Sequence, residues 1–268
     1  MVILDGKKLA EEILDELKEE IKKLPASPAG GPPMKLAVIL VDKNPASLNF
    51  IKQKQKAAKK IGVNFVLYKF KKNIKEENLI KELNKIIKNK SNTGIVVQLP
   101  LPKHLNEQRI LNIIPQKKDV DALSVDNFLV EPPAASAIME ILNFYHIRVK
   151  GKKVIIVGKG KLVGKPLAIM IKKRGANLFV CDRKTKNLAS KILKADILIS
   201  ATGQPHLIKE NMVKKGVVVI DAGFHKCKGD VDFENVKKKA SYITPVPGGV
   251  GPMTVAMLFS NLIKLAKK

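Results

Sequence analysis

The sequence predicts an α/β protein built on parallel sheets, and two observations carry that prediction. Short apolar runs, such as residues 36–41, alternate with longer segments whose apolar residues recur every three or four positions. Strands buried on both faces and amphipathic helices produce these two patterns, and their alternation indicates right-handed βαβ units. A second series begins at residues 153–157, where an apolar run leads directly into glycines and another helical segment.

The first half of the chain contains three expected strands. An amphipathic helix comes first, because apolar residues recur with helical spacing from Leu9 to Leu24. A loop rich in Pro, Gly and Ala follows over residues 25–33. Two prolines in Gln98-Leu99-Pro100-Leu101-Pro102 end the third strand, since proline cannot sit in a central ladder. We expect helices over residues 7–24, 46–61, 76–87 and 104–111, and strands over 36–41, 63–70 and 94–97.

The second half repeats the alternation after Pro132-Pro133 breaks the chain. A rigid, glycine-punctuated loop over residues 244–252 precedes the last helix. We expect helices over residues 135–144, 163–171 and 253–265, and strands over 153–157, 178–181, 197–200, 217–220 and 242–243. We place a first domain at residues 1–134, joined by the helix at 253–268, and a second domain at residues 135–252.

Composition indicates a soluble cytoplasmic protein without a membrane partner. The chain of 268 residues is 45% hydrophobic, enough for real cores, and has neither an apolar run of membrane-spanning length nor a signal peptide. Cys181 and Cys227 are too few for a disulfide scaffold and lack metal-ligand spacing, so we expect reduced thiols. The four histidines share no spacing typical of a metal site, and we expect none.

A net charge of +26 is the unusual feature of the composition. Only four basic residues are arginine, and the lysines are spread along the chain rather than gathered in one stripe. Arginine is the better residue for phosphate and base contacts. We therefore expect a solvated lysine-rich surface and no nucleic-acid partner, with electrostatic steering of an anionic substrate left open.

Glycines follow the strand at residues 153–157 and open the next helix. Backbone N–H groups at such a turn, together with the positive end of the helix, bind a pyrophosphate. The third glycine stands six residues after the first, so the spacing differs from G-x-G-x-x-G. The pattern predicts a Rossmann-type domain, with a merely tight strand-to-helix turn as the alternative. The expected cofactor contacts are Gly158, Lys159, Gly160, Val163 and Gly164.

Residues after two later strands are expected to contact the cofactor and to influence the choice between NAD and NADP. Asp182 and Arg183 follow the strand that ends at Cys181. An acidic residue there can bind the ribose 2′-OH of NAD, whereas an arginine can accommodate the 2′-phosphate of NADP. We expect NADP, with NAD possible. Thr202 and Gly203 follow the next strand and are expected to contact the cofactor; for Asp221 a site role and a structural turn are equally open.

Five segments with distinctive residues occur in a fixed order along the chain. Residues 94–102 (GIVVQLPLP) and 244–254 (TPVPGGVGPMT) are the most specific; the others are 44–54, 118–121 and 158–166. Their order and spacing resemble the bifunctional methylenetetrahydrofolate dehydrogenase/methenyltetrahydrofolate cyclohydrolase family. The resemblance extends from residue 4 to the last helix.

This resemblance implies two α/β domains around a folate-binding cleft, with the C-terminal helix returning to the first domain, and a homodimer. Such enzymes oxidise methylenetetrahydrofolate with NAD(P) and hydrate the methenyl product to 10-formyltetrahydrofolate. By position, Lys54 matches the catalytic lysine, Gln98 its hydrogen-bonding glutamine and Asp121 the carboxylate that holds the pterin. A helix or turn cap for Asp121 and a purely structural bond at the strand end for Gln98 are the alternatives. The expected substrate contacts are Phe50, Pro247, Gly248 and Gly249.

The chain departs from the family pattern in the cofactor turn, where Lys159-Gly160 stands in place of the common Arg-Ser, and at three further places. Phe50 stands where tyrosine is usual, Ala122-Leu123-Ser124-Val125 replaces Gly-Phe-His-Pro, and Pro132-Pro133-Ala134-Ala135 replaces Pro-Cys-Thr-Pro. A phenylalanine ring can still stack on the substrate but lacks the hydroxyl. We expect the missing hydroxyl to affect the cyclohydrolase step more than the dehydrogenase step. A relative with one activity, or a folate- or nucleotide-binding protein without turnover, is the alternative.

Overall fold

The computed structural model describes residues 1–25, 34–42, 44–124 and 129–267, and its contacts divide the chain into two compact units. Unit 1 comprises Met1–Ala10 and Ala134–Thr254, and unit 2 comprises Glu11–Pro133 and Val255–Lys268. Two long helices, α1 (Gly6–Lys22) and α9 (Val250–Ala266), contribute residues to both units. In the described part of the chain, no helix combines the length and the apolar content needed to cross a lipid bilayer.

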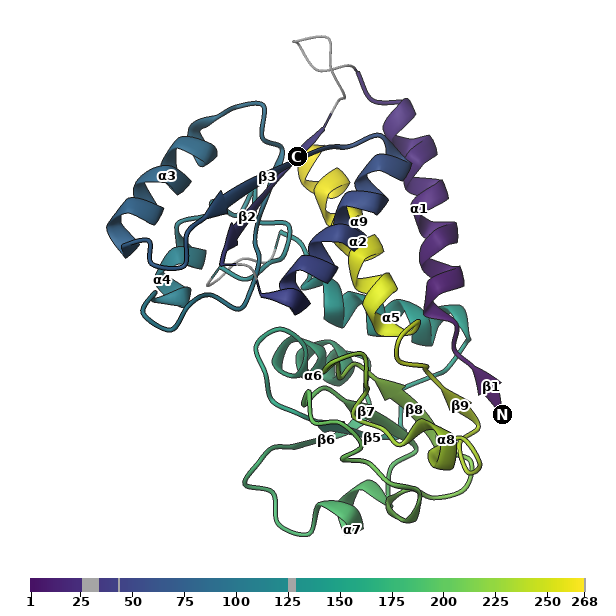
Figure 1. Ribbon diagram of the computed structural model, residues 1–268. Helices are drawn as coiled ribbons and strands as arrows, with labels where there is room; N and C mark the ends of the chain where they lie inside the picture. The colour runs from purple at the N-terminus through teal and green to yellow at the C-terminus, as the bar shows by residue number, and fades with distance from the viewer. Residues whose placement is uncertain (26–33, 43, 125–128, 268) are drawn as a thin grey trace. The chain divides into compact units, whose positions relative to one another are not determined.

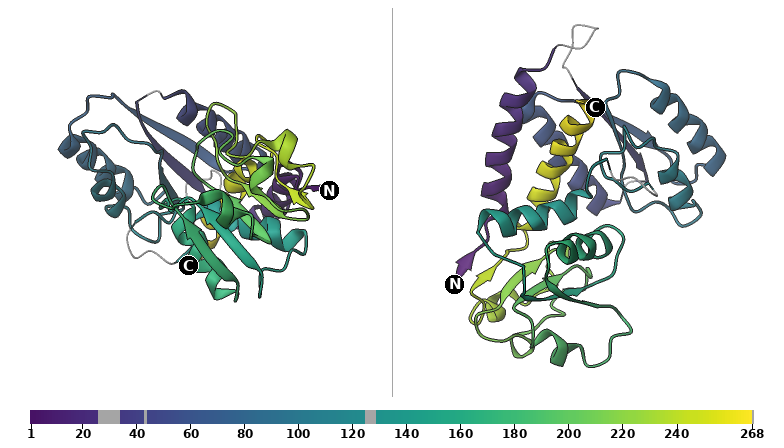
Figure 2. Two further views of the ribbon diagram at one scale, coloured as in Figure 1. Left: turned by 90° about the horizontal axis from the view of Figure 1, so that it is seen from below. Right: turned by 180° about the vertical axis from the view of Figure 1, so that it is seen from behind.

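Unit 2 is built on a three-stranded parallel sheet in the order β3-β2-β4. Figure 1 shows α3 and α4 on one face of this sheet and α2 and α9 on the other, and the view from behind in Figure 2 agrees. Apolar residues of the strands, α3 and α4 form one buried cluster, which explains the unbroken apolar runs of the sequence. The elements are β2 (Lys35–Val41), α2 (Pro45–Ile61), β3 (Asn64–Phe70), α3 (Glu76–Lys88), β4 (Gly94–Val97) and α4 (Glu107–Asn112).

The C-terminal helix packs directly on this sheet, at Gly94 of β4. A Cβ atom at Gly94 would lie 2.5 Å from Leu262 Cδ1 and 2.6 Å from Val120 Cγ1. Only a glycine leaves room for α9 at that point. The expected return of the last helix to the first α/β unit is therefore confirmed.

Unit 1 is built on a six-stranded parallel sheet in the order β1-β9-β8-β7-β5-β6. Figure 1 shows α5 and α6 on one side of the sheet and α7 and α8 on the other. The strand order reverses at β5, because β6 lies on one side of it and β7 on the other. In open α/β sheets a ligand binds at the carboxyl ends of the strands beside such a reversal. The elements are β1 (Val2–Ile3), α5 (Pro133–Phe144), β5 (Lys153–Val157), α6 (Gly164–Lys173), β6 (Asn177–Cys181), α7 (Leu188–Ile192), β7 (Ile197–Ser200), η1 (Glu210–Met212), β8 (Val218–Asp221), α8 (Phe233–Val236) and β9 (Tyr242–Ile243).

The predicted α/β class with parallel sheets is confirmed, and the differences lie at short elements and helix ends. Strand β1 was not predicted, because a two-residue strand has no periodicity; it pairs with β9 and places residues 1–10 in unit 1, not with the first sheet. Helices α7 and α8 were also missed, because helices of five and four residues are too short to show a helical periodicity. The expected loop at residues 25–33 lies, except for Pro25, outside the described residues.

Two predicted helix starts were wrong by three residues, whereas the others differ by at most two. Helix α4 starts at Glu107 rather than residue 104, because the side chain of Asn106 accepts a hydrogen bond from the backbone N–H of Arg109 at 3.1 Å and caps the helix. Helix α9 starts at Val250, inside the segment expected to be a rigid loop. Pro252 does not prevent this, since proline is tolerated in the first helical turn.

Candidate functional site

The side chain of Lys54 lies inside unit 2, close to the end of β4. Lys54 is only 7% exposed, and its Nζ donates a hydrogen bond to Oε1 of Gln98 at 3.1 Å. Lysine is almost never this buried unless it is paired or functional. The structure therefore brings together two of the three residues that the sequence analysis placed in catalysis.

The amide of Gln98 has a fixed orientation. Its backbone N–H donates to the carbonyl of Ile39 at 2.9 Å, which continues the ladder between β4 and β2 by one residue. The Nε2 group donates to the carbonyl of Leu99 at 2.9 Å, and the hydroxyl of Ser47 on α2 donates to the same carbonyl at 3.3 Å. Since the nitrogen end is held there, the oxygen end faces Lys54. Gln98 therefore forms the hydrogen bond to Lys54 in addition to hydrogen bonds that stabilise the end of the strand.

Burial shifts the pKa values of Lys54 and Asp121 in opposite directions. Burial lowers the pKa of the Lys54 amine, and the carboxylate of Asp121 partly offsets this. Burial raises the pKa of Asp121; Lys54 lowers it and Asp119 adds to the rise. Both groups are moved toward their neutral forms, so each can exchange a proton closer to neutral pH than in water.

The segment carrying Asp121 is held by Asp119 and by Asn261, two residues that the sequence analysis missed. The carboxylate of Asp119 accepts hydrogen bonds from the backbone N–H groups of Leu123 and Ser124, each at 2.9 Å, and from the Ser124 hydroxyl at 2.8 Å. Asp119, not Asp121, therefore caps this turn. On α9, the buried Asn261 donates to the carbonyls of Val120 and Glu131 at 3.0 and 2.8 Å. Asn261 could have been noticed in the sequence as a single amide side chain within the apolar face of the last helix.

Two departures from the family pattern, at Phe50 and at residues 122–125, lie in unit 2. Phe50 is half-buried on α2, one turn before Lys54. Ser124, which stands where histidine is usual, donates its hydroxyl to Asp119 and so stabilises the turn. Val125 lies outside the described residues.

The glycine turn of unit 1 connects β5 to α6 at the reversal of strand order. Gly158 has φ +114°, which glycine adopts without strain, and a Cβ there would lie 2.4 Å from the carbonyl oxygen of Ala201. A Cβ at Gly164, the first residue of α6, would lie 1.9 Å from the carbonyl oxygen of Gly158. Gly160 has open space around it. Two glycines are thus required by close backbone packing, and the third leaves room beside the helix N-terminus.

Three other residues predicted for the cofactor lie at the carboxyl ends of the neighbouring strands. Arg183 is exposed after β6, and Thr202 and Gly203 are half-buried after β7. Lys159 is exposed and Val163 is half-buried in the glycine turn itself. An open glycine turn, a helix N-terminus and a basic residue past the second strand fit the pyrophosphate and the adenosine ribose of a dinucleotide.

The segment Pro247–Gly249 is packed on the first turn of α1 within unit 1. The backbone N–H of Lys7 donates to the carbonyl of Gly248 at 2.7 Å. A Cβ at Gly6 would lie 2.0 Å from the carbonyl oxygen of Gly249, so residue 6 must be glycine. Pro247 is exposed, and Gly248 and Gly249 are half-buried and buried.

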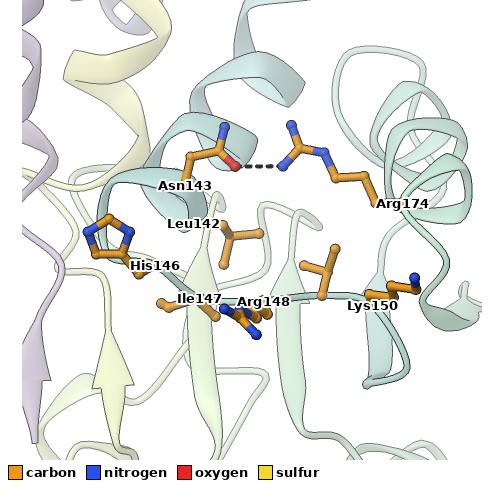
Figure 3. Close-up of a pocket in the computed structure, with 8 residues that line it drawn as sticks. Leu142, Asn143, His146, Ile147, Arg148, Lys150 and Arg174 are labelled. Carbon is orange, nitrogen blue, oxygen red and sulfur yellow. Dashed lines mark hydrogen bonds between the residues drawn. The ribbon is translucent and has the colours of Figure 1, made fainter.

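A basic cavity lies at the other end of the unit 1 sheet, before β5. Figure 3 shows it between the C-terminal ends of α5 and α6, with Asn143 accepting a hydrogen bond from Arg174 at 2.6 Å. Its volume is about 440 Å³, and Arg148 and Lys150 also line it. It contains none of the predicted site residues. Across the described ranges, no group of three or more His, Cys, Asp or Glu side chains could hold a metal ion.

Unit 1 contains two buried carboxylates, Asp221 at the end of β8 and Asp230 in the loop that follows. The sequence left the role of Asp221 open. Asp221 accepts hydrogen bonds at Oδ1 from the backbone N–H groups of Gly223 and Asp230, at 2.9 and 3.1 Å, and at Oδ2 from that of Val231, at 2.9 Å. Burial, the largest influence, raises the pKa of Asp221 to about 6. The structure thus shows Asp221 organising the loop that follows β8.

The raised pKa of Asp221 predicts a specific pH dependence of stability. Its ordinary value is 3.8, so between about pH 4 and 6 the folded protein binds a proton that the unfolded chain has lost. The stability that Asp221 contributes is complete below that range and is lost as pH rises through it, by about 3 kcal/mol. We expect Asp221→Asn to gain this amount relative to the unmodified protein between pH 4 and 7, measured by urea unfolding. A stability difference that does not change with pH would contradict the prediction.

A parallel sheet with a glycine turn at its reversal point defines a class: unit 1 has the architecture of NAD(P)-dependent enzymes. Sequence profiles agree for both parts of the chain. Residues 132–268 match the "Tetrahydrofolate dehydrogenase/cyclohydrolase, NAD(P)-binding domain", and residues 4–121 match the "Tetrahydrofolate dehydrogenase/cyclohydrolase, catalytic domain".

Individual relatives match over the whole chain. A "Bifunctional protein FolD" of Nautilia profundicola is 45% identical, covering 100% of this chain and 98% of that protein. The crystal structure of the bifunctional FolD enzyme of Campylobacter jejuni superposes with a TM-score of 0.94 at 42% identity and covers 100% of this chain and 99% of its own. The Trypanosoma brucei FolD structure, complexed with NADP cofactor and inhibitor, gives a TM-score of 0.93 at 33% identity, with 100% and 97% covered.

The chain belongs to the tetrahydrofolate dehydrogenase/cyclohydrolase family. The predicted family, the enzyme class and an NAD(P)-binding domain are thereby confirmed.

Proposed function

We propose that this protein oxidises 5,10-methylenetetrahydrofolate to 5,10-methenyltetrahydrofolate with NADP, and then hydrolyses the methenyl compound to 10-formyltetrahydrofolate. The observation that carries the proposal within this chain is the buried Lys54 amine, 3.1 Å from an oriented Gln98 amide. A family relationship over the full length supports it. Folate chemistry is assigned to the part built on β2–β4, and cofactor binding to the part built on β5–β9.

The residues of unit 2 account for proton transfer and substrate binding. Burial lowers the pKa of Lys54, so its amine is neutral more often than that of a lysine in water and can accept the proton of a water that attacks the methenyl carbon. Gln98 holds the amine in place. Asp121 can accept hydrogen bonds from the amino-pyrimidine edge of the pterin, as carboxylates do with cytosine-like groups. Bound NADP supplies the acceptor for the hydride that leaves the methylene carbon.

A spectroscopic assay tests both steps. The purified chain with methylenetetrahydrofolate and NADP should accumulate the absorbance of the methenyl compound, and that absorbance should then decay by hydrolysis. Absence of methenyl formation with either NADP or NAD would end the dehydrogenase assignment. Decay no faster than in buffer alone would end the cyclohydrolase assignment.

The choice of NADP over NAD rests on the turn after β6. Asp182, the residue that could bind a ribose 2′-OH, already accepts hydrogen bonds at Oδ1 from the backbone N–H of Lys184 at 2.9 Å and from the Thr185 hydroxyl at 3.3 Å. Arg183 is exposed beside it and forms no ion pair with any described residue. An arginine in this position suits a 2′-phosphate.

Substitution of Arg183 should therefore change cofactor preference. We expect Arg183→Ala to raise the KM for NADP about tenfold, the size of one charge-assisted hydrogen bond, and to change the KM for NAD little. Steady-state kinetics with each cofactor measure this, with Arg174→Ala, which removes an arginine from the basic cavity, as the matched control. Equal effects on NADP and NAD would refute the assignment.

We also propose that the protein forms a homodimer. Among the described strands, β6 is the last in its sheet and pairs only with β5, so its other edge can pair with another chain. Phe179 on this strand is 45% exposed and offers an apolar surface at that edge. Sedimentation equilibrium should give twice the mass of the chain. The cytoplasmic location stays a prediction.

A family member with only one activity is the second candidate. Phe50 has no hydroxyl, so it cannot form the hydrogen bond by which a tyrosine would orient a water or the Lys54 amine. Such a protein would form the methenyl compound and leave it unhydrolysed. The two phases of the spectroscopic assay separate the candidates directly.

A further inference from the structure

Asp230 is a fully buried carboxylate that the proposed function does not use. It stands in the loop between β8 and α8. Its Oδ2 atom accepts a hydrogen bond from the Ser200 hydroxyl at 2.7 Å and from the backbone N–H of Thr202 at 2.6 Å. One oxygen of Asp230 therefore fixes both the end of β7 and the start of the turn that follows it.

That turn packs against the glycine turn of the cofactor site. Residue 201 lies between the two groups that Asp230 binds, and its carbonyl oxygen is the atom that a Cβ at Gly158 would approach to 2.4 Å. The carbonyl oxygen of Gly158 in turn lies against Gly164, the first residue of α6. Backbone atoms thus connect Asp230 to the helix N-terminus through three close contacts. A shift at residues 200–202 is transmitted to the glycine turn, since no flexible side chain lies between them.

We propose that Asp230 is a positioning residue for the dinucleotide cofactor, holding residues 200–202 so that the glycine turn keeps its cofactor-binding shape. The inference rests on the proposed cofactor site at Gly158–Gly164 and Thr202-Gly203. Asp230 has no accessible surface, so it would act on a bound cofactor only through the backbone that it holds.

The surroundings of Asp230 are built around its carboxylate. Asp221 accepts the backbone N–H of Asp230 and of the residue after it, which fixes the backbone on which the Asp230 side chain is carried. A Cβ at Gly223 would lie 2.0 Å from Oδ1 of Asp230, and a Cβ at Gly229 would lie 2.1 Å from Oδ2 of Asp221. Both positions must therefore be glycine for the carboxylates to fit.

A purely stabilising role does not explain this choice of residues. Neither Asp221 nor Asp230 forms an ion pair with a described residue, and Oδ1 of Asp230 has no hydrogen-bond partner among them. Burying unpaired carboxylates lowers stability relative to neutral side chains of similar shape. The carboxylate of Asp230 accepts hydrogen bonds from two donors, the Ser200 hydroxyl and the Thr202 backbone N–H, beside the proposed cofactor site. This role explains why a carboxylate is buried there.

Four variants of the full-length chain test the proposal. Asp230→Ala removes the acceptor, and Asp230→Asn keeps an oxygen that can occupy the place of Oδ2. Ser200→Ala removes one of the two donors and leaves the Thr202 bond. Asp232→Asn is the matched control, because Asp232 is in the same loop but bonds to Asn235 at 2.8 Å rather than to residues 200–202.

NADP affinity is measured by calorimetry, with circular dichroism to establish that each variant is folded. We expect Asp230→Ala to weaken NADP binding about tenfold or more, and Ser200→Ala about threefold, as the loss of buried hydrogen bonds implies. Asp230→Asn and Asp232→Asn should bind like the unmodified protein. In kinetics, the KM for NADP should rise for Asp230→Ala while the KM for the folate substrate stays constant.

The outcomes separate this inference from the proposed function. If the unmodified protein binds neither NADP nor NAD, the cofactor assignment itself is wrong. If the unmodified protein binds NADP and a folded Asp230→Ala variant binds it equally well, the positioning role is refuted. Should Asp230→Ala fail to fold, unchanged NADP affinity in Ser200→Ala refutes the role instead.

Discussion

Replacing Lys54 by methionine is expected to suppress hydrolysis of 5,10-methenyltetrahydrofolate while the protein stays folded. Methionine keeps an unbranched apolar side chain in the buried space and removes only the amine, whose burial is itself unfavourable for the charged form. General acid–base catalysis contributes about 100- to 10,000-fold, so a loss in this range is expected. The decay of the methenyl absorbance measures it.

The matched control for Lys54 is Lys56→Met. Lys56 is on the same helix, is exposed and plays no part in the bond to Gln98. It should hydrolyse the methenyl compound at the rate of the unmodified protein. Hydrolysis within about threefold of normal in Lys54→Met, a far smaller loss than a general acid–base residue implies, would remove Lys54 from the mechanism.

Adding one methyl group at Gly164 is expected to damage the cofactor turn severely. The Cβ of an alanine would stand 1.9 Å from the carbonyl oxygen of Gly158, and neither group can rotate away, because both belong to the backbone. Overpacking of this kind costs about 3 kcal/mol of the free energy of unfolding, or shifts the turn. We therefore expect Gly164→Ala to lose NADP binding and to unfold at lower urea concentration.

Gly160→Ala provides the comparison for Gly164→Ala. It makes the same chemical change four residues earlier in the same turn, but no atom lies within 4 Å of the new Cβ. Its unfolding midpoint should equal that of the unmodified protein. Equal stability of the two alanine variants would show that the close approach of Gly158 and Gly164 does not constrain the turn.

Most of the regular fold was predictable because its signals are local. The run at residues 36–41 and the stripe from Leu9 to Leu24 each contain their own periodicity, so β2 and α1 could be placed from neighbouring residues alone. Strand β1 could not, since its two residues become a strand only by pairing with Tyr242 and Ile243. The start of α4 depended on a single cap, the side chain of Asn106.

The residues of the candidate site were likewise predictable only in part, because their pairing depends on contacts between distant segments. Lys54 and Gln98 are 44 residues apart, and their pairing was inferred only through a family resemblance; in the structure it follows from α2 and β4 packing in one unit. Asp119 was overlooked because Asp121, two residues later, has the same side chain. Which of the two caps the turn depends on where residues 118–119 pair with β4.

By itself, the sequence determined that this is an α/β protein of the tetrahydrofolate dehydrogenase/cyclohydrolase family with a glycine turn for a dinucleotide, because periodicity and motifs are properties of adjacent residues. Only the tertiary structure decided that the Lys54 amine is buried against Gln98, and that Asp230 holds the end of β7. Burial and hydrogen bonding depend on segments distant in the sequence, and those contacts exist only when strands and helices have packed. The protonation behaviour of Lys54, Asp121 and Asp221 follows from that packing.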